Sequence, residues 1–263
     1  MSAVRALVCG AEGLYLQPMN EHYKPTAREP VFNLPPVVIA SVAVLGIVHA
    51  IRVWLLNPDQ DAWVIAAFSF VPVRITMPST FGFDWPGGVA GDVWTFFTYA
   101  FLHADWMHFG INALWLAAFG TPLARRFGAV RFVLFSLLGA AGGAALHLVF
   151  NPNGVAPLVG ASAAIAAQMA AAARFAFSPG GRLGGGGLSP DADHRAALSM
   201  AEMIRSRRVM MFLGVWFVFN LIFGLLFTPP GVHGQVAWDA HIGGFVVGLL
   251  FFPIFDPVRR HAA

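Results

Sequence analysis

The stretch from Val236 to Phe255, VAWDAHIGGFVVGLLFFPIF, decides the class of fold. It is apolar except near its start, where Asp239 and His241 stand. A helix of about 20 residues rises about 30 Å, which is the thickness of the hydrocarbon core of a bilayer. The stretch therefore predicts a membrane-spanning helix rather than a helix in the core of a soluble domain.

Five further apolar blocks precede this one, and the composition agrees with them. Hydrophobic residues make up 57% of the 263 residues and charged residues only 11%, whereas soluble domains carry roughly 25% charged residues. The sequence predicts an all-α polytopic membrane protein, a bundle of six transmembrane helices. The predicted spans are about 37–56, 106–123, 130–150, 158–177, 209–227 and 236–255.

These blocks divide the chain into three parts. We expect a polar N-terminal tail over residues 1–36, a membrane domain over 37–255 and a short tail over 256–263. No apolar run precedes Val37, so we expect no cleavable signal peptide, and the polar tail should be flexible.

Two segments outside the spans have a distinct composition. Residues 57–105 contain several prolines and many aromatic side chains, which fits a segment at the membrane interface better than a span. The glycine run Gly180–Gly187 predicts a flexible linker between spans four and five. Outside both segments, the lone cysteine, Cys9, cannot form an internal disulfide, and we expect it to have no special role.

The charges on the connections indicate which helix ends face the cytoplasm. Arginine without acid lies between spans two and three, arginine exceeds acid between spans four and five, and two arginines follow span six. The segment between spans one and two is mainly acidic. Because Lys and Arg accumulate on the cytoplasmic side, we predict cytoplasmic N- and C-termini, with the even-numbered spans beginning at the outer face. The basic pI near 9.6 is then a topology signal and does not indicate a nucleic-acid partner.

Four polar side chains stand inside predicted spans, where polar groups are costly and are functional candidates. Ser162 lies near the start of span four and His241 near the start of span six, while His108 and Asn112 lie near the start of span two. Since these spans begin outside, all four residues should lie in the outer part of the bilayer. His108 and Asn112 are four residues apart and share one helix face.

These four groups can carry out acyl transfer. A serine hydroxyl becomes a nucleophile when an adjacent base takes its proton, and histidine titrates in the right range to be that base. An asparagine amide and a histidine N–H can donate hydrogen bonds to the oxyanion of a tetrahedral intermediate. We therefore expect Ser162 and His241 to be catalytic and His108 with Asn112 to stabilise the oxyanion.

Small residues surround the two predicted reacting groups. Ser162 stands within Gly160-Ala161-Ser162-Ala163-Ala164, and His241 is followed by Gly243, Gly244 and Gly248. Small residues four apart allow two membrane helices to approach closely. We expect spans four and six to touch, because only then can the serine and the histidine form a hydrogen bond.

The sequence resembles the rhomboid family of intramembrane serine proteases from about residue 90 to 255. The motifs that carry the resemblance, in order, are Phe101-Leu102-His103, His108, Asn112, Gly160-Ala161-Ser162 and Ala240-His241-x-x-Gly244-x-x-x-Gly248. The resemblance implies that Ser162 is the nucleophile and His241 the base, and that His108 and Asn112 help the Ser162 backbone to hold the oxyanion. It also implies a Ser/His dyad without an acid, single-span membrane protein substrates cut near their outer ends, and no metal or cofactor.

Four positions depart from the pattern of that family. Ala163 stands where glycine is common after the serine, and Thr95 stands where arginine often follows the tryptophan of the first loop. Ala124 replaces a common glutamate, and Ala166 stands where some members stack an aromatic ring on the histidine. None of these changes removes a reacting group, but they leave open how the loop is anchored and how the ring is supported.

Other polar residues have simpler interpretations. We expect His103 to make a structural hydrogen bond, and His49, His147 and Asn220 to be polar groups in helix packing. Asp239 is two residues from His241 on the same helix, so it should point elsewhere and should not act as a third catalytic residue.

Two other functions remain possible from the sequence. One is a catalytically inactive relative that binds membrane clients, and the other is a transporter or proton channel that uses His108, Asn112 and His241. Transporters place their sites near the midplane between repeats, whereas these residues gather toward one face and the chain has no internal repeat. The excess of Arg over Lys, with abundant Ala and Gly, favours a bacterial inner membrane.

Overall fold

The computed structural model describes residues 8–10, 13–15, 34–82, 84–187, 189–226 and 236–258. The chain forms two units, Met1–Asn33 and Leu34–Ala263. In the first unit, strands β1 (Val8–Gly10) and β2 (Gly13–Tyr15) pair antiparallel. The sequence predicted a flexible tail here and missed this strand pair, to which Cys9 belongs. Residues 1–7, 11–12 and 16–33 of the predicted tail, the connection 227–235 and the last residues 259–263 lie outside the described residues.

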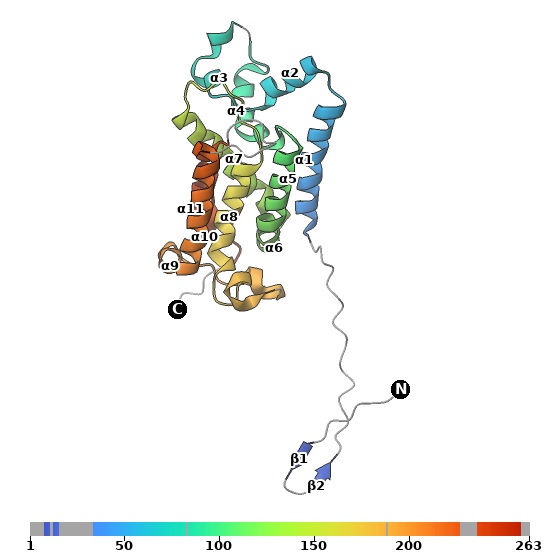
Figure 1. The fold of residues 1–263 in the computed structure, drawn as a ribbon, viewed down its shortest axis with the longest axis vertical. Helices are drawn as coiled ribbons and strands as arrows, with labels where there is room; N and C mark the ends of the chain where they lie inside the picture. Colours follow the sequence, from blue (N-terminus) through green and yellow to red (C-terminus); the bar gives the residue numbers. More distant parts are fainter. Residues whose placement is uncertain are drawn as a thin grey trace. The chain divides into compact units, whose positions relative to one another are not determined.

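The named elements of the second unit are all helices in its described part (Figure 1). Its longer helices are α1 (Pro36–Trp54), α2 (Pro58–Phe68), α4 (Gly88–Thr98), α5 (Trp106–Trp115), α7 (Ala129–Phe150), α8 (Ser162–Ala176), α10 (Arg207–Leu221) and α11 (Trp238–Phe255). The shorter ones are α3 (Pro72–Thr76), η1 (Pro78–Phe81), η2 (Tyr99–Phe101), η3 (Leu116–Gly120), α6 (Thr121–Phe127), η4 (Arg182–Gly186), η5 (Pro190–His194), α9 (Met200–Arg205) and η6 (Ile222–Leu226).

A helix lies at each of the six predicted spans. These helices are α1, the continuous run α5–η3–α6, α7, α8, α10 with η6, and α11. Four of them, α1, α7, α10 with η6, and α11, are long and apolar enough to cross a membrane. That all six helices cross the membrane and that both termini are cytoplasmic remain predictions.

Helix α8 begins later than the sequence predicted. The predicted span starts near Leu158, but Leu158 is extended. Its backbone N–H and C=O form hydrogen bonds with the backbone C=O and N–H of Phe70. Gly160 then adopts φ +119°, a left-handed conformation that favours glycine. The chain turns there, and Ser162 becomes the first residue of the helix.

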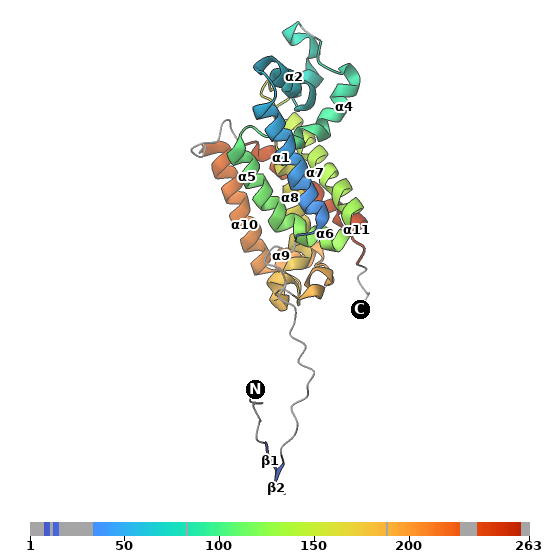
Figure 2. The same ribbon diagram turned by 90° about the vertical axis from the view of Figure 1, so that its right-hand side faces the viewer.

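Helix α8 is the buried centre of the bundle, and small residues bring its neighbours close (Figures 1 and 2). A Cβ atom added to Gly244 on α11 would lie 2.0 Å from the carbonyl oxygen of Ala163, and one added to Gly248 would lie 2.4 Å from that of Ala167. The prediction that spans four and six touch is confirmed. On the other side of α8, Gly143 leaves the space that the Ala163 methyl group occupies, so alanine is tolerated after the serine.

The segment 57–105 folds into short helices at one end of the bundle (Figure 1). Arg74 is buried and holds this segment together: its guanidinium pairs with Asp92 at 2.8 Å and donates to the backbone oxygens of Ala66, Pro86 and Gly88. These bonds anchor the segment although Thr95 stands where the family often has arginine.

The opposite end of the bundle is also tied together by arginine. Arg126 forms two hydrogen bonds of 2.8 Å to Asp256 and donates to the backbone oxygens of Asp193 and Arg195. Arg182 pairs with the buried Asp193. The described part of the connection between α8 and α10, which includes the predicted flexible linker Gly180–Gly187, is thereby held against the ends of α6 and α11.

Candidate active site

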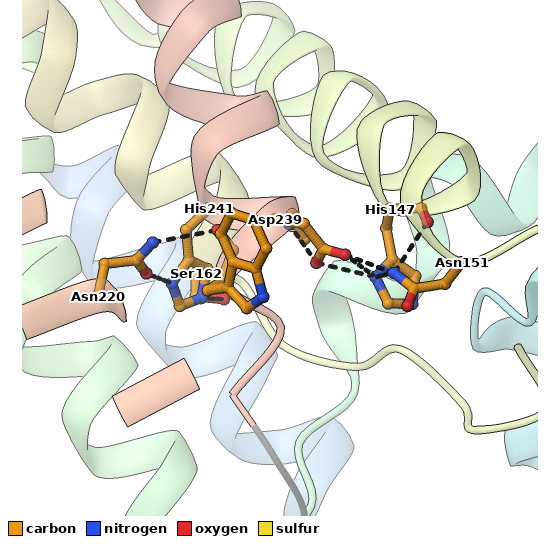
Figure 3. A network of polar contacts seen from close by, with 8 residues as sticks. His147, Asn151, Ser162, Asn220, Asp239 and His241 are labelled. Carbon is orange, nitrogen blue, oxygen red and sulfur yellow. Dashed lines mark hydrogen bonds and ion pairs between the residues drawn. The ribbon is translucent and has the colours of Figure 1, made fainter. Parts of the chain in front are cut away.

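The side chains of Ser162 and His241 meet between α8 and α11 (Figure 3). The distance from the Ser162 Oγ to the His241 Nε2 is 2.7 Å, a hydrogen bond. Ser162 is at the N-terminus of α8 because of the turn at Gly160, and His241 is one turn into α11. The contact depends on the close approach of the two helices at Gly244. The structure therefore brings together the two residues that the sequence predicted to react.

Asn220, on α10, contacts the other side of the His241 ring (Figure 3). Its Oδ1 lies 2.6 Å from the His241 Nδ1, and its Nδ2 donates to the backbone oxygen of Trp238 at 3.1 Å. The sequence interpretation gave Asn220 a role in packing alone and missed its contact with the ring. A signal was present, since Asn220 is the one amide side chain in an otherwise apolar span.

His108 and Asn112 lie one turn apart on α5 and face the turn before Ser162. A Cβ atom added to Gly160 would lie 2.7 Å from the His108 Nε2 and 3.6 Å from the Asn112 Nδ2. The Nδ1 of His108 accepts a hydrogen bond from the backbone N–H of Ala104 at 3.4 Å. A neutral imidazole that accepts at Nδ1 carries its proton at Nε2, so the N–H of His108 faces Gly160.

The amide of Asn112 is a buried donor. The side chain is 3% exposed, and within the described part of the chain its Nδ2 has no hydrogen-bond partner. Most buried polar atoms are hydrogen-bonded, and an exception calls for an explanation. The unpaired Nδ2 lies beside the turn before Ser162, where it can donate a hydrogen bond to an anionic oxygen.

Asp239 points away from the His241 ring, as predicted (Figure 3). Its carboxylate contacts the His147 Nδ1 at 2.9 and 3.1 Å, accepts from the Asn151 Nδ2 at 2.5 Å, and accepts from the Ala240 backbone N–H. The bonds join the end of α7 to the start of α11. The packing role predicted for His147 is confirmed.

The prediction for the His103 side chain was wrong. His103 is fully buried, and neither of its ring nitrogens has a hydrogen-bond partner among the described residues. Its backbone oxygen accepts a hydrogen bond from Arg52 at 2.8 Å. The ring instead packs against the His108 ring, with centroids 5.2 Å apart. Burial, with His108, His49 and Arg52 nearby, lowers the pKa of His103 to about 3, so the ring is neutral.

His49 packs among aromatic rings, as expected for a polar group in helix packing. Its ring centroid is 4.6 Å from that of Trp106. Among the residues that the structure describes, no group of three or more His, Cys, Asp or Glu side chains is placed to hold a metal ion. The reactive groups gathered here are the Ser162 hydroxyl, the His241 ring and the donors on α5.

Comparison with known proteins points to one family. A family model for the Rhomboid domain matches residues 90–256. RHOMBOID-like protein 1 of Arabidopsis thaliana is 31% identical over 50% of this chain and 36% of its own length. RHOMBOID-like protein 6, mitochondrial, of the same plant is 29% identical over 52% of this chain and 49% of its own length. Rhomboid-related protein 1 of Caenorhabditis elegans is 28% identical over 50% of this chain. The chain spans between about a third and a half of the length of these relatives.

Proposed function

Because this chain belongs to the rhomboid family and is an integral membrane protein, we propose that it is an intramembrane serine endopeptidase that cleaves transmembrane substrates. The observation that carries the proposal is the 2.7 Å hydrogen bond between the Ser162 Oγ and the His241 Nε2. A hydroxyl that donates to an imidazole nitrogen is already paired with the base that must take its proton.

In the proposed reaction, the Ser162 oxygen attacks the carbonyl carbon of the scissile peptide bond. The His241 Nε2 takes the hydroxyl proton as the C–O bond forms, and the ring becomes an imidazolium. It then gives this proton to the nitrogen of the leaving amine, and the C–N bond breaks. A water molecule hydrolyses the resulting ester of Ser162 by the same proton transfers in reverse.

The oxyanion of the tetrahedral intermediate needs donors that are already in position. The His108 Nε2–H and the Asn112 Nδ2 both face the turn at Gly160, two residues before the nucleophile. The backbone N–H of Ser162, at the N-terminus of α8, adds a third donor and the favourable end of the helix dipole. We assign the oxyanion role to His108 and Asn112, which accounts for the buried, unpaired amide of Asn112.

The setting of the reaction follows from the positions of the four residues. His108, Ser162 and His241 all lie within the first four residues of their helices, at the end of the bundle that carries α2 and α4 (Figure 2), and Asn112 lies one turn further along α5. With the predicted topology this is the outer end, where water for hydrolysis is accessible and where a single-span substrate leaves the bilayer. We therefore propose single-span membrane proteins as substrates.

The proposed compartment is a bacterial inner membrane, with six spans and cytoplasmic termini. The support for a bacterium is the composition alone, with 15 of 16 basic residues being arginine. The relatives reported above come from a plant and a nematode and give this point no support.

The Ser162→Ala variant tests the proposed function. In proteoliposomes that contain a single-span test substrate, we expect cleavage by the wild-type protein and none by Ser162→Ala or His241→Ala. A fluorophosphonate probe should label the wild-type protein and not Ser162→Ala, whose melting temperature should be unchanged. Equal cleavage by wild type and Ser162→Ala would refute the proposal. A wild-type protein that binds the substrate but neither cleaves it nor reacts with the probe would favour the inactive, client-binding alternative.

A further inference from the structure

Two hydrogen bonds fix the orientation of the Asn220 side-chain amide. One side of the amide faces the backbone oxygen of Trp238, and the other faces the His241 Nδ1. A carbonyl oxygen can only accept, so the group that faces Trp238 must be the donor, Nδ2. The Oδ1 of Asn220 is therefore the atom that faces the ring, and the amide assignment follows from the network.

This orientation determines which ring nitrogen of His241 carries the proton. An amide oxygen only accepts, so a hydrogen bond of 2.6 Å to it requires an N–H at Nδ1. A neutral imidazole has a single N–H, which leaves Nε2 with a free lone pair. That lone pair faces the Ser162 hydroxyl at 2.7 Å, so the ring is in the one neutral form that can act as a base toward Ser162.

We propose that Asn220 is a positioning residue that holds His241 in the Nδ1–H form and stabilises the imidazolium formed during catalysis. The proposal rests on the proposed function. It replaces a Ser/His pair with a Ser–His–Asn arrangement built from α8, α11 and α10. Within the described part of the chain, Ser162 and Asn220 are the side chains hydrogen-bonded to the ring, and the carboxylate of Asp239 is directed to α7 instead.

Burial strengthens the role of Asn220. Its side chain is 6% exposed, so water has little access to replace the Oδ1 as the acceptor for the Nδ1–H. The Asn220 Nδ2 also holds the ring indirectly, because it donates to the backbone oxygen of Trp238, the first residue of α11. His241 follows three residues later on the same helix. Loss of Asn220 would leave the ring free to rotate and to carry its proton on Nε2, where it cannot accept from Ser162.

Two substitutions distinguish a role of Asn220 in positioning the His241 ring from a role in bracing helix α11. Asn220→Ala removes both hydrogen bonds, whereas Asn220→Asp keeps an acceptor for the Nδ1–H but cannot donate to the Trp238 oxygen. The matched control is Val215→Ala, a truncation at an exposed position of α10. For each protein we would measure kcat and KM on the single-span test substrate and the rate of labelling by a fluorophosphonate. The ¹⁵N chemical shifts of the His241 ring, assigned by comparison with His241→Ala, distinguish a protonated from a free ring nitrogen.

We expect Asn220→Ala to lower kcat by about 100-fold, within the contribution of a general base, with KM nearly unchanged. Its Nε2 should carry the proton, whereas in the wild-type protein and Val215→Ala the proton should be on Nδ1. Asn220→Asp should keep the proton on Nδ1 and recover activity to within about tenfold of wild type, because it retains the acceptor. The pH below which activity falls should be higher for Asn220→Asp than for wild type, because a carboxylate beside the ring favours the imidazolium. The other titratable groups near the ring, His108 and Asp239, are the same in all variants.

Unchanged kcat and unchanged ring shifts in Asn220→Ala would overturn the proposal. Equal losses in Asn220→Ala and Asn220→Asp, with Nδ1 protonated in both, would also overturn it and would show that Asn220 only braces α11. Both results are distinct from failure of the proposed function, in which wild type and Ser162→Ala would cleave equally.

Discussion

At the scale of single residues, the position of the unpaired Asn112 amide beside the Ser162 turn supports a functional role. A structural asparagine in a helix bundle uses its donors within the protein. The Asn112 Nδ2 is buried, faces the turn before Ser162, and has no partner in the described part of the chain. In the proposed mechanism its partner is the oxyanion, which exists only during the reaction.

Replacement of Asn112 by alanine should therefore reduce activity without reducing stability. We expect kcat to fall by about 10²–10³-fold, the effect of losing one oxyanion donor. The melting temperature should stay the same or rise, because removal of a buried, unpaired polar group costs no hydrogen bond. Steady-state kinetics and thermal unfolding in detergent would measure both. A marked loss of stability with kcat intact would assign Asn112 to packing.

His103 gives a prediction on pH at the same scale. Its pKa is about 3 in the folded protein, against about 6.5 for an unfolded histidine. Between these values the unfolded state binds more protons than the folded state. Stability contributed by the neutral ring is therefore present above pH 6.5 and is lost as the pH falls toward 3.

We expect His103→Gln to have a smaller drop in melting temperature between pH 7 and pH 4 than the wild-type protein. His194→Gln, at an exposed position, is the control and should keep the wild-type acid sensitivity. An identical pH dependence in His103→Gln and wild type would contradict the assignment.

At the scale of elements, the contact between α8 and α11 determines whether the two reacting groups meet. Its closeness depends on glycines rather than on shape complementarity of large side chains. At Gly244 even one added methyl group would lie 2.0 Å from a backbone oxygen of α8. The backbone cannot move aside as a side chain could, so the helices themselves must separate.

Gly244→Ala should therefore lower both activity and stability. Overpacking of a close contact costs about 1–3 kcal/mol, and separation of α11 from α8 should lengthen the hydrogen bond between His241 and Ser162. Gly214→Ala on α10 is the matched control, because an added Cβ there meets nothing within 4 Å. We would compare melting temperatures and fluorophosphonate labelling rates. Wild-type labelling in Gly244→Ala would show that the contact is looser than the structure places it.

At the scale of the whole molecule, the topology decides which side of the membrane the site faces. The predicted topology puts the connection between α7 and α8 outside and that between α8 and α10 inside, where Arg126 and Arg182 gather. The four residues of the site then lie near the outer surface. An inverted topology would make the same site face the cytoplasm.

Cysteine labelling in intact cells tests the orientation. In a Cys9→Ser background, Ala156→Cys should react with a membrane-impermeant maleimide, since it is exposed on the predicted outer connection. Ala201→Cys, exposed at the other end, should react only after the membrane is permeabilised. The reverse pattern would invert the topology and leave the site geometry unaffected.

The sequence by itself determined the helical membrane class and the approximate positions of the helices, and it selected His108, Asn112, Ser162 and His241 as candidate site residues. These follow from hydropathy and from polar residues placed in apolar blocks, which are properties of local sequence. The contact of Asn220 with His241, the start of α8 at Ser162 and the anchoring of the segment 57–105 by Arg74 were decided only in the tertiary structure. Each depends on how helices far apart in the chain rotate and approach one another, and no local pattern of residues encodes that rotation.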